Sequence, residues 1–113
     1  MLPQLLELLK SSSLITTNHA IIALGLIAKN KTQHKKNILL SLLSIVDNDF
    51  KTEQCLNIAI GKLMKTYLLF AEDILKEKRI IQFVNQTLHN DNQATRPKAQ
   101  KLLKLIMKNQ LSS

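Results

Sequence analysis

Glycine, proline and aromatic residues are scarce in this chain of 113 residues. There are two glycines, two prolines and no tryptophan, and aromatic residues make up 4 % of the sequence. Sandwiches, barrels and glycine-rich phosphate loops need glycine and proline at their turns. We therefore expect neither a β architecture nor an enzyme that cradles a nucleotide. With so few aromatic rings, a stacking platform for single-stranded nucleic acid is not expected either.

Cysteine and long apolar runs are also limited. Cys55 is the single cysteine, which excludes an intramolecular disulfide and fits a reducing compartment such as the cytoplasm. The longest apolar runs, 20–28 and 67–71, fall short of the roughly 18 residues that a membrane-spanning helix needs. The first ten residues lack the features of a signal peptide. The sequence thus predicts a cytoplasmic protein without a membrane partner.

Positive charge is abundant and unevenly distributed. Sixteen Lys and Arg residues against eight Asp and Glu give a net charge of +8. Residues 1–56 carry an excess of +2 and residues 57–113 an excess of +6. Clustered positive charge favours anionic partners. Arginine, the usual reader of guanine, occurs only as Arg79 and Arg96, so base-specific DNA recognition is not expected.

Apolar residues recur at spacings of three and four along most of the chain, which predicts an all-helical protein. We expect six helices, at 2–9, 18–29, 35–46, 52–67, 74–88 and 97–109. Thr16 or Thr17 should cap the second helix, Thr52 the fourth, and Pro97 should open the sixth. The second helix is apolar on every side, so we expect neighbours to cover it all round.

Three short-loop helix pairs follow from this pattern, as approximate repeats 2–32, 35–71 and 74–110 of a single domain, 1–113. Residues 23–29 overlay residues 59–65 at a separation of 36, and the third copy, 102–108, lies 43 residues further on. Periods of this size are typical of helical solenoids. Gly25 and Gly61 occupy matching positions inside helices, where we expect them to mark close helix approach rather than a ligand.

Two segments of this sequence resemble the HEAT and armadillo-like repeats. The run Ala-Ile-Ile-Ala-Leu-Gly-Leu-Ile at 20–27 is similar to the second helix of such a repeat, and Thr-Arg-Pro-Lys-Ala at 95–99 is similar to its opening. The family's arginine is present as Arg96, whereas the first two copies have Thr17 and Glu53. The resemblance implies a right-handed α-solenoid of about three antiparallel helix pairs, which binds a protein or peptide in the groove lined by the second helices.

The lysines of the second helices are the candidate binding residues. Lys29, Lys65 and Lys108 align near the ends of these helices, and Lys62 and Lys104 lie one turn away. On the last helix Lys101 shares the polar side with Lys104 and Lys108. A ridge of these residues suits an acidic peptide or, alternatively, the phosphate backbone of a nucleic acid without sequence preference. The simpler alternative is that lysines late in a helix only satisfy carbonyls and the helix dipole.

A third alternative is a structural one. The chain can be a fragment of a longer solenoid, or it can self-associate as a homo-oligomer through an open end, because solenoids need polar caps. The first helix is rich in leucine, and Leu105 and Met107 extend the apolar arc of the last helix.

No pattern in the sequence indicates catalysis, a cofactor or a metal. The three histidines are His19, His34 and His89. Their spacing from one another and from Cys55 is not that of metal ligands. Cys55 is expected to be a small core residue. Asp47 and Asp49 lack the glycine and the distal glutamate of a calcium loop. We therefore expect a non-enzymatic protein.

Overall fold

The computed structural model describes residues 2–112, which form helices joined by turns and loops and contain no strand. The α-helices are α1 (Leu2–Leu8), α2 (Leu14–Asn30), α3 (Lys35–Ser41), α4 (Glu53–Tyr67), α5 (Ala71–Ile74), α6 (Lys78–Thr87) and α7 (Thr95–Ser112). Short 3-10 helices lie between them: η1 (Thr32–His34), η2 (Leu42–Asp47) and η3 (Leu68–Phe70). The predicted all-α class is confirmed.

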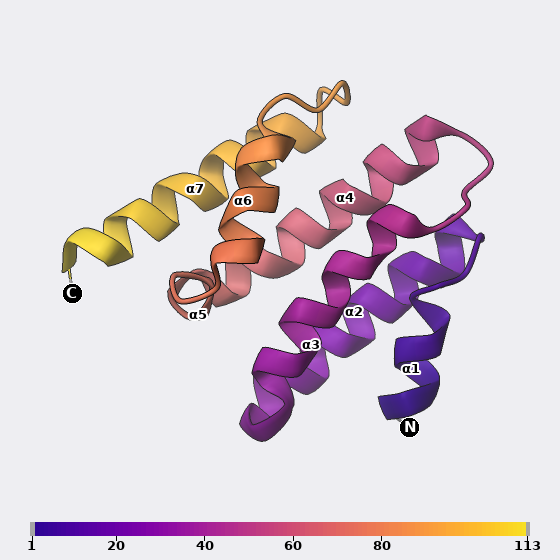
Figure 1. The fold of residues 1–113 in the computed structure, drawn as a ribbon, viewed down its shortest axis with the longest axis horizontal. Coiled ribbons are helices and arrows are strands. Elements are labelled where there is room, and N and C mark those ends of the chain that lie inside the picture. Colours follow the sequence, from indigo (N-terminus) through magenta and orange to yellow (C-terminus); the bar gives the residue numbers. More distant parts are fainter. Residues whose placement is uncertain (1, 113) are drawn as a thin grey trace.

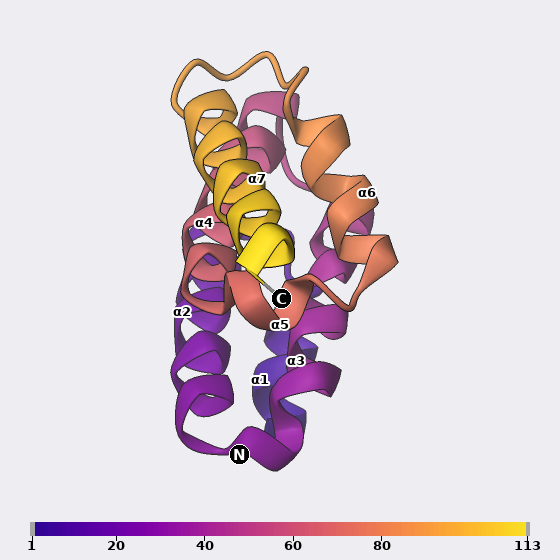
Figure 2. The same ribbon diagram turned by 90° about the vertical axis from the view of Figure 1, so that its left-hand side faces the viewer.

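The helices form two layers. In Figure 1, α2, α4 and α7 run side by side in the same direction, and α1, α3 and α6 run back in the opposite direction. Figure 2 shows these two sets on opposite sides of the molecule. The Cα atoms extend over 40 × 34 × 18 Å, and the shortest extent fits two layers of helices packed at about 8–10 Å. Within the first layer α2 contacts α4, and α4 contacts α7.

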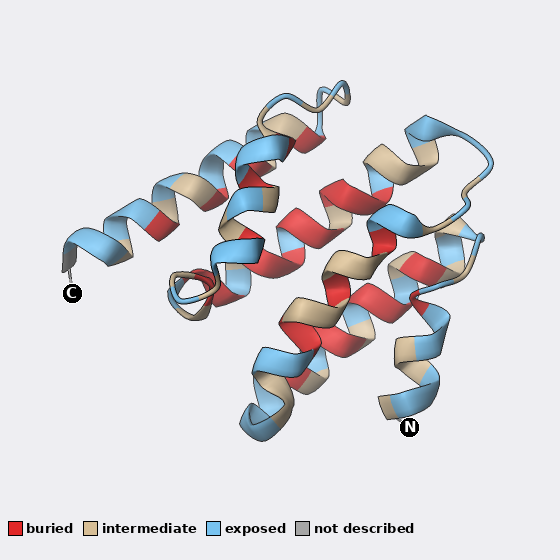
Figure 3. Ribbon diagram, viewed as in Figure 1, coloured by how far each residue is buried: buried red, intermediate tan, exposed pale blue. Residues whose placement is uncertain are grey.

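The hydrophobic core lies between the layers, and buried residues are concentrated along the middle of α2, α3 and α4 (Figure 3). Tyr67 is among the largest fully buried side chains, and its hydroxyl donates a hydrogen bond of 2.7 Å to the carbonyl oxygen of Leu39. Burial raises the pKa of this phenol well above its ordinary value. The bond therefore ties α4 to α3 through a neutral tyrosine.

The two glycines allow the helices of the first layer to approach closely. A Cβ atom on Gly25 would lie 2.9 Å from Cγ2 of Thr66 on α4, and one on Gly61 would lie 2.7 Å from Oγ1 of Thr95 on α7. Both distances are shorter than a Cβ atom tolerates. The expectation that these glycines mark close helix approach is confirmed, at both contacts of the first layer.

Two helix starts were predicted with mixed success. Thr52 caps α4 as expected, since its hydroxyl oxygen accepts a hydrogen bond from the backbone N–H of Cys55 at 3.1 Å. The predicted cap of the second helix is wrong. Ser13 caps α2, accepting from the N–H of Thr16 at 3.3 Å, while the hydroxyl of Thr17 donates to the carbonyl of Ser11. The helix therefore begins at Leu14, earlier than predicted.

The predicted helix over 74–88 is wrong at its start. Ile74 ends the short α5, and a turn over 75–77 separates it from α6. Glu77 has φ −113° and ψ 92°, which is not a helical conformation. This break lets Ile74 bury its side chain completely while Ile80, also fully buried, enters the core from a separate helix.

Two other boundaries depend on local hydrogen bonding. The predicted helix over 35–46 is α-helical only to Ser41 and continues as η2. The last helix begins at Thr95, before Pro97, because the side-chain oxygen of Asn92 accepts from the N–H groups of Ala94 (2.8 Å) and Thr95 (3.1 Å). The Asn92 side chain thus satisfies the amide of Ala94, directly before α7, and shares the amide of Thr95 with the backbone carbonyl oxygen of Asn92 itself.

The expectation that α2 is covered on all sides is wrong. Ile22 and Leu26 are 43 % and 56 % exposed. α1 and α3 contact α2 from the second layer and α4 contacts it within the first, which leaves the outward side of α2 bare. An apolar surface therefore faces away from the core on this helix.

Candidate partner-binding face

The six predicted lysines all lie on the first layer. Lys29 belongs to α2, Lys62 and Lys65 to α4, and the other three to α7: Lys101, Lys104 and Lys108. Lys62 is half-buried and the others are exposed. On α7 the core side is marked by Ala99, Leu102 and Ile106, and the three lysines fall on the opposite side of the helix. We call the outward side of α2, α4 and α7 the lysine face.

Nearly all of the net charge belongs to these three helices. They contain eight cationic residues and one acid, Glu53, whereas the rest of the chain contains eight cationic residues and seven acids. Ion pairs between described residues join Lys10 to Glu7 and Lys35 to Asp73, and neither pair lies in α2, α4 or α7. The three helices therefore carry +7 of the net charge of +8.

The lysines are not all explained by the helix dipole. Lys29 and Lys65 lie in the last turns of α2 and α4, where a cation is favourable for the helix itself. Because these helices run in the same direction, both lysines lie toward the same end of the layer (Figure 1). Lys101 and Lys104 lie in the interior of α7, beyond the range of that effect.

A groove of about 300 Å³ lies between α2 and α4 on this face. Its lining combines aliphatic side chains with two lysines: Ile22, Gly25, Leu26, Lys62, Lys65, Thr66 and Leu69. Because Gly25 has no side chain and packs against Thr66, the space above it stays open. The sequence pointed to the lysines but missed the aliphatic part, since it predicted a fully covered α2.

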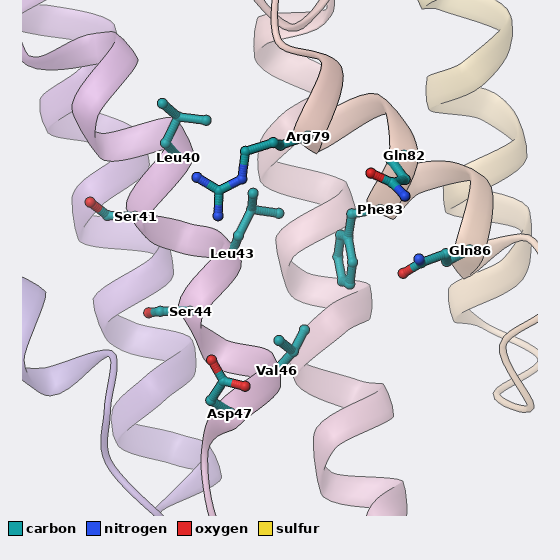
Figure 4. Close-up of a pocket in the computed structure, with 10 residues that line it drawn as sticks. All are labelled: Leu40, Ser41, Leu43, Ser44, Val46, Asp47, Arg79, Gln82, Phe83 and Gln86. Atoms are coloured by element: carbon teal, nitrogen blue, oxygen red, sulfur yellow. The ribbon is translucent and has the colours of Figure 1, made fainter.

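A second cleft, of about 410 Å³, opens on the other layer between α3, η2 and α6 (Figure 4). Arg79 reaches from α6 toward Leu40 and Leu43, and Asp47, the last residue of η2, lies at the opposite end. Phe83 extends between the two segments. This cleft carries one charge of each sign and was not predicted, because both of its walls were expected to be longer regular helices.

The chain was compared with family models, curated proteins and solved structures. No match was found in any of the three.

The residues with catalytic or metal-binding potential lie apart. His19 is on α2, His34 on η1 and His89 follows α6. Cys55 is half-buried in the first turn of α4 and does not belong to the hydrophobic core. The prediction that it is a core residue is therefore wrong. Within residues 2–112 no group of three His, Cys, Asp or Glu side chains is arranged to hold a metal ion. No helix in that range has the length and apolar character needed to cross a membrane.

Proposed function

We propose that this chain is a non-enzymatic HEAT/armadillo-like α-solenoid that binds an acidic segment of a protein partner on the lysine face. The charge distribution is the observation that carries the proposal: eight cationic residues and one acid on α2, α4 and α7. The pairs α1–α2, α3/η2–α4 and α6–α7, with their second helices side by side, support a solenoid of three repeats. A surface of one charge sign attracts a partner of the opposite sign and fixes its position.

The groove between α2 and α4 favours a protein partner over a nucleic acid. Lysines alone suit phosphates and carboxylates equally. Ile22, Leu26 and Leu69 offer aliphatic surface beside Lys62 and Lys65, and a sugar-phosphate backbone has no aliphatic side chain that could enter the groove. An acidic polypeptide supplies both carboxylates and apolar side chains.

A binding experiment with charge-matched variants tests this proposal. The face variant is Lys29→Gln, Lys65→Gln and Lys101→Gln, all exposed on the first layer. The control variant is Lys36→Gln, Lys76→Gln and Lys78→Gln, which are exposed elsewhere and remove the same charge. Fluorescence anisotropy of a labelled acidic peptide is measured with each protein over a range of salt concentrations.

The face variant is expected to bind about tenfold more weakly than the wild-type protein, because three exposed ion pairs contribute about 0.5 kcal/mol each. The control variant should bind within about threefold, and added salt should weaken binding to all three proteins. Equal losses in both variants would contradict a localised face. Duplex DNA that displaces the peptide from the wild-type protein would instead support phosphate binding.

A further inference from the structure

A row of exposed aliphatic side chains runs along the outward side of α2. Ile15, Ile22 and Leu26 are 70 %, 43 % and 56 % exposed, and their spacing of seven and four residues places them on one side of the helix. Eleven residues of helix span about 16 Å. The row therefore spans about three helical turns: Ile22 and Leu26 line the groove over Gly25, and Ile15 lines a separate hollow beside Phe50.

The neighbouring helix complements this row with charge. Ile58, Lys62, Lys65 and Leu69 follow one another at spacings of four, three and four, which places them on one outward side of α4 and its continuation η3. The aliphatic members are exposed, Leu69 to 65 %. α2 has no acidic residue, and the single acid of α4, Glu53, is the first residue of that helix. We call the strip between the two helices the α2–α4 seam.

We propose that the α2–α4 seam binds an amphipathic acidic helix of a partner protein. An apolar side chain of that helix would enter the groove over Gly25, between Leu26 and Leu69, and the rest of its apolar side would lie on the α2 row. Acidic side chains on its flanks would reach Lys62 and Lys65. This is recognition of a helix in a groove, in which apolar residues three, four and seven apart act as anchors. The inference rests on the proposed function and specifies the conformation and pattern of the partner.

Charge and shape exclude two other occupants. A second copy of the chain would bring the same lysine face, formed by helices with eight cations and one acid, against itself. A nucleic acid would leave the α2 row facing phosphates. An anionic bilayer has both charge and apolar material, but a planar surface does not fill a 300 Å³ hollow between two helices. This argument disfavours a membrane, and the vesicle experiment below tests it directly.

Two peptides of identical composition and charge test the inference. One arranges leucine and glutamate so that leucines fall on one side of a helix, and the other scrambles the same residues to remove that side. The matched protein variants are Leu26→Gln with Leu69→Gln at the seam, and Leu111→Gln, an exposed leucine near the end of α7. All three replaced side chains are exposed, so the fold is expected to persist, and far-UV circular dichroism of each protein verifies this.

The wild-type protein should bind the amphipathic peptide about tenfold more tightly than the scrambled one, and the bound peptide should gain helical circular dichroism. The seam variant should bind both peptides with the affinity that the wild-type protein has for the scrambled peptide, while Leu111→Gln should behave as the wild-type protein. Equal affinity of the wild-type protein for both peptides would overturn this inference and leave the proposed function standing. Absence of salt-dependent binding to either peptide would overturn the proposed function itself.

Phosphatidylserine-containing vesicles provide the remaining arm. Vesicles that compete with the amphipathic peptide for the wild-type protein, and that bind the seam variant more weakly, would assign the seam to a membrane surface and overturn the inference. No competition is the expected result, because the seam is hollowed between two helices rather than flat.

Discussion

Alkaline pH should destabilise this protein through Tyr67. It is the single tyrosine, its side chain is fully buried and its hydroxyl is hydrogen-bonded to the carbonyl of Leu39. Burial raises its pKa in the folded state, whereas the unfolded chain releases the phenolic proton near the ordinary pKa of about 10. Above that pH the unfolded state holds fewer protons than the folded state, so the stability conferred by neutral Tyr67 is lost as the pH rises.

The size of the effect follows from linkage of one proton. Each pH unit above about 10 removes about 1.4 kcal/mol, so about 2.7 kcal/mol is lost by pH 12. This is a large share of the 5–15 kcal/mol that stabilises a typical domain. Because Tyr67 is the single tyrosine and the chain has no tryptophan that would overlap its absorbance, tyrosinate absorbance reports on Tyr67 alone. We expect the rise of that absorbance to coincide with the loss of helical circular dichroism.

The variant Tyr67→Phe separates this effect from lysine deprotonation. At neutral pH it should lower the free energy of unfolding by about 1–2 kcal/mol, because the buried carbonyl of Leu39 loses its donor. Between pH 10 and 12 it should lose less stability than the wild-type protein. Tyrosinate absorbance that rises with a midpoint near 10 while the helical signal stays constant would refute the reasoning, since it would show that solvent reaches the phenol in the folded state.

Three further predictions concern the packing of α7. Gly61→Ala gains about 1 kcal/mol of helix propensity but places a Cβ atom 2.7 Å from Oγ1 of Thr95. Urea unfolding should therefore show a net decrease of about 1–2 kcal/mol in the free energy of unfolding. In the double variant with Thr95→Ala, the decrease should be smaller than the sum of the two single decreases. Asn92→Ala should cost about 1 kcal/mol in the same assay, because the amide of Ala94 loses its acceptor and the amide of Thr95 keeps only the backbone carbonyl of residue 92. Met107 and Leu111 are exposed near the end of α7, so light scattering should give a mass that rises above one chain with concentration, and a constant mass would exclude association through this end.

Much of the fold was predictable because its signals are local. A spacing of three and four is a property of each helix by itself, and the predicted helices over 2–9 and 52–67 agree with α1 and α4. The cap at Thr52 depends on four consecutive residues. Gly25 and Gly61 stood out because glycine is disfavoured inside a helix unless something requires it, and each packs against a threonine.

The errors arise where an outcome depends on residues distant in sequence. The turn over 75–77 interrupts a run that is periodic by itself, because Ile74 and Ile80 enter the core from separate helices. The apolar run of α2 is compatible with full burial, and only the arrangement of α1, α3 and α4 around it shows that Ile22 and Leu26 stay exposed. For the same reason the lysines of the candidate site were predictable and its groove was not.

The concentrated positive charge explains how this protein can expose an aliphatic row on α2 without associating through it. An apolar strip on a small protein promotes association, and the strip on α2 lies beside α4, in a layer that carries +7 of the net charge. Two such faces repel each other at ionic strengths where the Debye length is about 8–10 Å, so the charge protects the strip from copies of itself. The same charge attracts a ligand that brings carboxylates. Selectivity on this face therefore needs both features in one partner: acidity to approach the lysines, and apolar side chains to cover Ile22 and Leu26.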